Sequence, residues 1–94
     1  MASIRNLKKD ISFVTSEIVI ECFTYNYLFP DKNHEELAKI ISDSLEMQKD
    51  LLHQINAVKK DKEISAKKQF KEIRKQFKQK IEDIVKRLNA LSIE

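Results

Sequence analysis

The sequence predicts an all-α protein: a three-helix antiparallel up-down bundle that is elongated and self-associating. Three observations predict this class. The 94 residues include no glycine, on which tight hairpins, phosphate-binding loops and catalytic elbows depend. The single proline interrupts the chain once. Apolar residues recur at helical spacing over most of the length. At this size residues 1–94 are expected to form a single helical domain.

The first predicted helix covers residues 4–28 and carries apolar residues on two sides. One set has the spacing of a helix face packed in a core: Ile4, Leu7, Ile11, Val14, Ile18, Cys22 and Tyr25. The second set, called the apolar stripe below, consists of Phe13, Ile20, Phe23 and Tyr27. Aromatic residues alternate at the end of this segment as in a strand. A helix is nevertheless favoured, because no glycine-based hairpin is available to pair a strand.

The apolar stripe has two interpretations. Each helix of a monomeric three-helix bundle touches two others, so the two apolar sets could face the second and third helices. Alternatively, the stripe is a self-association surface, as in a dimer that forms a six-helix assembly. Large apolar side chains left in water cost about 25 cal/mol per Å². We therefore expect something to cover the stripe.

The second predicted helix covers residues 34–58 and follows a loop at Pro30. The residue before a proline avoids helical geometry, so the first helix should end near Phe29. Asn33 and Glu36 have the spacing of a capping box, with Asn in place of Ser or Thr, and predict the start of the helix. A heptad spacing then runs through Leu37, Ile41, Ser44, Gln48, Leu51, Ile55 and Val58.

The third predicted helix covers residues 62–91, after a turn near residues 58–62. Lys59 and Lys60 suit a helix C-terminus, and Asp61 suits an N-cap. The phase of the apolar pattern also changes here, because a new set passes through Ala66, Phe70, Ile73, Phe77, Ile81, Ile84, Leu88 and Leu91. Since no glycine or proline marks the boundary, one continuous helix through the second and third segments is the alternative.

Basic residues concentrate on one side of the third helix. Acidic residues are in excess over residues 1–58 and basic residues over 59–94, although the net charge is only +3. The group called the basic face below consists of Lys67, Lys68, Lys71, Arg74, Lys75 and Lys78. Such a face could neutralise phosphates of RNA or DNA without sequence preference. Because Phe70 and Phe77 lie on the core side, no aromatic platform for base stacking accompanies it.

Nothing in the sequence predicts a catalytic, metal-binding or cofactor-binding site. One side of the second helix carries an acidic face, composed of Asp43, Glu46, Asp50 and His53. It contains a single carboxylate-x-x-His step and points away from the apolar set, so we expect a solvated surface rather than a metal site.

Two other features of the first helix involve residue types that are often catalytic. Cys22, the single cysteine, lies within the apolar set, and we expect a buried thiol rather than a nucleophile or a disulfide partner. Glu17 and Glu21 flank that set. Because nothing predicts a cleft that would separate their pKa values, we expect solvated carboxylates.

A short stretch at the start of the chain carries a family resemblance. Ile4–Ile11, followed by an apolar first helix, resembles a group of short uncharacterised bacterial all-helical proteins. Ile41–Leu45 and the third helix, rich in Lys and Glu, are similar to them as well. No activity or site residue is assigned to that group, so the resemblance implies no function.

The sequence therefore supports hypotheses about function rather than an identification. The favoured hypothesis is a non-enzymatic helical interaction or structural module. It would be cytoplasmic, with coiled-coil packing and with itself, as a homodimer, or another helical protein as partner. The alternative is a nucleic-acid-associated protein that uses the basic face. No secretory signal is evident, and the most apolar stretch, residues 18–29, is too short and too polar to span a bilayer.

Overall fold

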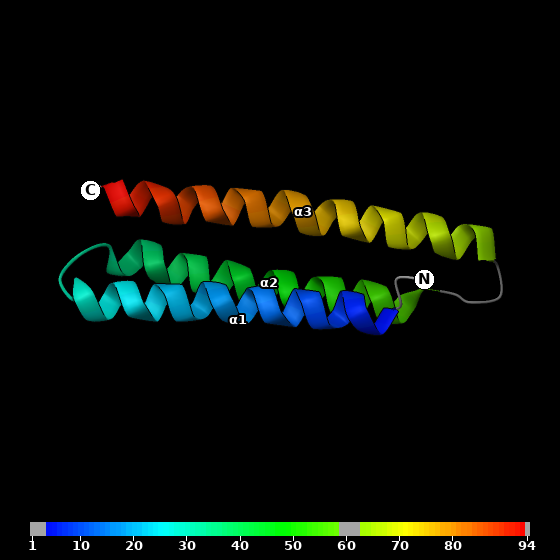
Figure 1. The fold of residues 1–94 in the computed structure, drawn as a ribbon, viewed down its shortest axis with the longest axis horizontal. Coiled ribbons are helices and arrows are strands. Elements are labelled where there is room, and N and C mark those ends of the chain that lie inside the picture. Colours follow the sequence, from blue (N-terminus) through cyan, green and yellow to red (C-terminus); the bar gives the residue numbers. More distant parts are fainter. Residues whose placement is uncertain (1–3, 59–62, 94) are drawn as a thin grey trace.

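Three helices lie side by side in the computed structural model, which describes residues 4–58 and 63–93. They are α1 (Ile4–Leu28), α2 (His34–Ala57) and α3 (Glu63–Ile93). α1 and α3 run in the same direction and α2 runs opposite to both (Figure 1). The molecule measures 52 × 21 × 17 Å. The prediction of an elongated, all-α, up-down three-helix bundle is confirmed.

The loop between α1 and α2 turns at Pro30. The backbone N–H of Phe29 donates to the carbonyl of Tyr25 (2.8 Å), and that of Lys32 donates to the carbonyl of Phe29 (3.1 Å). Asn33 then takes the left-handed conformation, with φ 56° and ψ 31°. Among non-glycine residues, asparagine tolerates this conformation best. In a chain without glycine, asparagine therefore closes the loop.

The start of α2 at His34 agrees with the sequence, but the predicted capping box is wrong. A capping side chain belongs to a residue in extended conformation. Asn33 is left-handed and makes no side-chain cap; its amide Nδ2 donates instead to Tyr25 Oη at 2.9 Å. The first turn of α2 is stabilised by the acidic residues Glu35 and Glu36, which interact favourably with the helix dipole.

α2 and α3 are separate helices, so the alternative of one continuous helix is wrong. α2 ends at Ala57, and Val58 is extended, with φ −66° and ψ 126°. α3 then runs back along α2 (Figure 1). Most of the predicted turn lies outside the described residues, including Lys59, Lys60 and Asp61.

The apolar core follows α2 along its length, with α1 packed most extensively against it and α3 less so. Its buried members are Leu7, Ile11, Ile18, Cys22, Leu37, Ile40, Met47, Leu51, Ile55, Val58, Ile73, Ile84 and Leu91. Phe70 and Phe77 of α3 are half-buried at its edge. Two buried hydroxyls, those of Thr15 and Ser44, donate to the carbonyl four residues earlier, each at 2.7 Å.

The predicted register of α2 is wrong by one residue at two positions. Ile40 and Met47 are buried where the heptad spacing selected Ile41 and Gln48, which are only half-buried. The reason is that α2 is the middle helix. It must face both neighbours, so its buried surface is broader than the single line of contact that a heptad describes.

Candidate functional site

The apolar stripe of α1 is exposed. Its four side chains, Phe13, Ile20, Phe23 and Tyr27, are 66%, 56%, 61% and 84% accessible. At 100° per residue they lie on the side of α1 opposite the fully buried Ile11. Neither α2 nor α3 covers them. The interpretation in which the stripe faces a neighbouring helix of the same chain is therefore wrong.

Three of the four members of the stripe are evenly spaced about Ile20. Phe13 lies seven residues before Ile20 and Tyr27 seven residues after it. Seven residues make nearly two turns, so the outer side chains lie roughly 10 Å on either side of the centre. The row Phe13, Ile20 and Tyr27 can pair with a copy of itself across a twofold axis, because each end then meets the opposite end. Phe23 has no counterpart in this row, since the residue three positions before Ile20 is Glu17.

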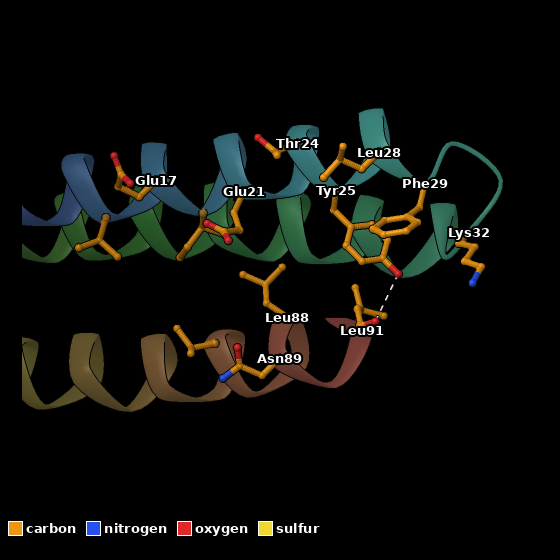
Figure 2. Close-up of a pocket in the computed structure, with 13 residues that line it drawn as sticks. Glu17, Glu21, Thr24, Tyr25, Leu28, Phe29, Lys32, Leu88, Asn89 and Leu91 are labelled. Atoms are coloured by element: carbon orange, nitrogen blue, oxygen red, sulfur yellow. Dashed lines mark hydrogen bonds between the residues drawn. The ribbon is translucent and has the colours of Figure 1, made fainter. Parts of the chain in front are cut away.

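A groove of about 610 Å³ separates α1 from α3. It exists because α3 packs mainly on α2 and touches α1 least. Its apolar lining comes from both helices and consists of Val14, Ile18, Leu28, Val85, Leu88 and Leu91. Figure 2 shows Leu88 of α3 projecting into the gap below α1. No pattern in the sequence indicates this groove, because its existence depends on the distance between two helices.

One end of the groove is closed by a hydrogen-bond network around Tyr25. The hydroxyl of Tyr25 donates to the carbonyl of Leu91 at 3.3 Å (Figure 2) and accepts from the amide of Asn33 at 2.9 Å. One side chain thus joins α1, the loop and α3. Beside it, the rings of Tyr25 and Phe29 are 5.1 Å apart, and the ammonium of Lys32 lies 5.9 Å from the Phe29 ring.

The α1 side of the groove carries two carboxylates, Glu17 and Glu21. They are one helical turn apart and exposed, as the sequence predicted. Glu21 points toward the gap (Figure 2). Neither forms an ion pair with any side chain in the described part of the chain. The groove therefore combines an apolar floor with two carboxylates on its α1 edge and one cation, Lys32, beside Phe29 at the end near the loop.

The basic face lies on the outside of α3. All six of its members are exposed: Lys67, Lys68, Lys71, Arg74, Lys75 and Lys78. None pairs with a carboxylate among residues 6–58 and 66–91. No exposed aromatic side chain accompanies them, because Phe70 and Phe77 pack against the core. The face can attract anions, but it offers no surface on which bases would stack.

The acidic face of α2 is only partly a solvated surface. Glu46 and His53 are exposed, but Asp43 and Asp50 reach α3. Asp43 accepts from Arg87 at 2.7 Å and Asp50 from Lys80 at 3.5 Å. The guanidinium of Arg87 also contacts Glu36 at 3.3 Å. The sequence could not reveal these pairs, because their partners are at least 30 residues apart.

The pKa values of Arg87 and Cys22 are both shifted in the direction expected for structural residues. The hydrogen bond to Asp43 raises the pKa of Arg87, against the lowering effect of burial. Burial, and then the charge of Glu21, raises the pKa of the Cys22 thiol. Cys22 is 1% exposed, so the expectation of a buried thiol is confirmed. In the described part of the chain, no group of three or more His, Cys, Asp or Glu is placed to hold a metal ion.

Comparison with known proteins yields no match to any family model, curated protein or solved structure. Among the described residues, no helix is both long and apolar enough to cross a membrane.

Proposed function

We propose that this protein is a non-enzymatic helical interaction module whose partner is a second copy of itself, docked through the apolar stripe of α1. The exposure of the stripe carries the proposal. Four large apolar side chains on one side of a single helix form a patch of the kind that marks an interface.

The area of the stripe supports a dimer. At about 150–250 Å² per large side chain, the exposed fractions of the stripe add up to roughly 500 Å² per copy. Two copies facing each other would bury roughly 1,000 Å², the lower bound for a specific interface.

The even spacing of Phe13, Ile20 and Tyr27 favours antiparallel packing of the two α1 helices. With a twofold axis at Ile20, Phe13 of one copy meets Tyr27 of the other. Lys9 lies one turn before Phe13 and is exposed. In the pair it would lie near the other copy's loop, which carries the exposed Asp31. This pairing of opposite charges would favour one relative orientation of the two copies more than it would strengthen their binding.

Sedimentation equilibrium on the wild type and on Ile20→Glu tests the proposal. The wild type should approach twice its chain mass of 11.1 kDa at micromolar concentration. Ile20→Glu places a charge at the centre of the interface and should remain monomeric, with unchanged helicity because the site is exposed. Leu45→Glu, at an exposed position of α2, is the matched control and should remain dimeric. A wild type that stays monomeric at millimolar concentration contradicts the proposal.

Anion binding by the basic face is the second candidate, favoured by six exposed basic side chains without partners among the described carboxylates. RNA or DNA should bind weakly, with affinity falling steeply as salt rises. Filter binding at low salt measures this effect. Lys71→Glu combined with Lys75→Glu should weaken binding, whereas Lys49→Glu on α2 should change it little. Absence of binding at low salt contradicts this candidate.

A further inference from the structure

The groove between α1 and α3 has the shape of a missing fourth helix. α1 and α3 are parallel and both rest on α2, so a helix laid over the gap and antiparallel to both would complete a four-helix bundle. Along α1 the lining runs from Val14 to Leu28. Fourteen residues correspond to roughly 21 Å, or four turns of an incoming helix.

The interior of the groove is suited to apolar side chains. Its floor is formed by the buried Ile18 and Leu91, which are 5% and 6% exposed. Leu28 and Val85 stand at its edges and are 61% and 40% exposed. Side chains that repeat at helical spacing on an occupant would cover these edges, as in the helix-in-groove mode of peptide recognition.

Two carboxylates and one lysine line the groove, and the carboxylates define the chemistry of the occupant away from the loop, because Lys32 lies beside Phe29 at the loop end. Glu17 and Glu21 are one turn apart and unpaired among the described residues. Lys or Arg residues three or four positions apart on an incoming helix would match that spacing. An acidic helix would be repelled.

These charges argue against a second copy of this chain as the occupant. The exposed apolar side chains of α1 are flanked by the same two carboxylates, Glu17 and Glu21, so α1 of another copy would bring like charge to the edge. The lysine-rich α3 has most of its apolar side chains packed in its own core, with Val85 exposed. From these observations we propose that the groove docks a basic amphipathic helix of a different protein. This surface is separate from the apolar stripe.

Two designed helical peptides of 18 residues test the proposal. Both carry leucines at positions i, i+3, i+4 and i+7, repeated along one side. One has lysines at the flanking positions and the other has glutamates. Fluorescence anisotropy should give at least tenfold tighter binding of the lysine peptide to the wild type. Chemical shift changes should centre on Val85 and Leu88, and not on Ile20.

Charge reversal at the groove provides the decisive comparison. The double variant Glu17→Lys and Glu21→Lys should reverse the preference toward the glutamate peptide. The control Glu72→Lys and Glu82→Lys makes the same change in net charge at exposed positions of α3 outside the groove lining. It should keep the original preference.

Several outcomes would overturn the inference. They are no binding of either peptide, equal affinities in the wild type and the reversed variant, or shift changes centred on the stripe. Saturable binding of dodecyltrimethylammonium without peptide binding would make the groove a small-molecule site and would also overturn it. Repeating the titration with the Ile20→Glu variant keeps the two proposals apart, because peptide binding there must persist whether or not the wild type dimerises.

Discussion

The two helix pairs that share α2 are held together by different forces. Where α1 packs on α2 the core is apolar. Ile11 of α1 is completely inaccessible to solvent, as are Ile40 and Leu51 of the shared helix α2, and no ion pair joins α1 to α2 among the described residues. Between α2 and α3 the buried residues are fewer and polar contacts accompany them. These are Arg87 with Glu36 and Asp43, Lys80 with Asp50, and Gln54 with Gln76 at 3.0 Å.

This difference assigns separate roles to the two contacts. Apolar burial is strong but non-directional, so the α1–α2 pair supplies most of the stability. Exposed ion pairs add little free energy, but they favour one alignment of charges over others. The polar contacts therefore set the register of α3 on α2. α3 is thus the less firmly attached helix, and it also forms one wall of the groove.

The largest expected effect comes from truncating the apolar contact. Leu51→Ala should lower the free energy of unfolding by about 3 kcal/mol, because the side chain is fully buried and leaves a cavity. Phe77→Ala on α3 should cost about 2 kcal/mol despite its larger side chain, because Phe77 is only half-buried. Chemical denaturation measures both values. A larger loss for Phe77→Ala would break the comparison, and Leu45→Ala at an exposed site should cost little.

The sequence predicted the apolar part of this comparison better than the polar part. Periodicity located the three helices and placed Ile11, Leu51 and Ile73 in the core, because burial repeats along a helix in a fixed pattern. It also separated the stripe from the core-facing side of α1. The contacts of Arg87 and the groove depend on which helices become neighbours and how closely they approach. No local pattern encodes that information.

At Asn33, too, a local sequence pattern failed to predict a tertiary contact. Its spacing from Glu36 suggested a cap, and the helix does begin there, yet the side chain bonds to Tyr25. The decisive fact is the backbone conformation of Asn33, which the loop imposes. The absence of glycine could have pointed to it, because some other residue then has to take any left-handed position.

A smaller effect is expected where the three helices meet, at Tyr25. Tyr25→Phe removes the hydroxyl that bonds to Leu91 and leaves the amide of Asn33 without that acceptor. The free energy of unfolding should fall by about 1–2 kcal/mol. Amide hydrogen exchange in the last turn of α3 should also accelerate, because that end loses a tie to α1. Ser42→Ala, which removes an exposed hydroxyl from α2, is the control and should change neither quantity. Equal effects of the two variants would contradict a structural role for the Tyr25 network.

The smallest effect concerns the polar contact itself. Arg87→Gln should lower the free energy of unfolding by about 0.5 kcal/mol, because Asp43 is exposed and Arg87 only half-buried, so water screens the pair. Raising the salt from 0.05 M to 1 M should remove most of the difference from the wild type, since the Debye length falls to about 3 Å. Lys86→Gln controls for the loss of one positive charge on α3. Because the polar contacts set the register of α3 on α2, Arg87→Gln should change the chemical shifts of Leu88 and Leu91 even though the loss of free energy is small. A loss as large as that of Leu51→Ala would show that α3 depends on charge for its attachment, and the division between the two contacts would fail.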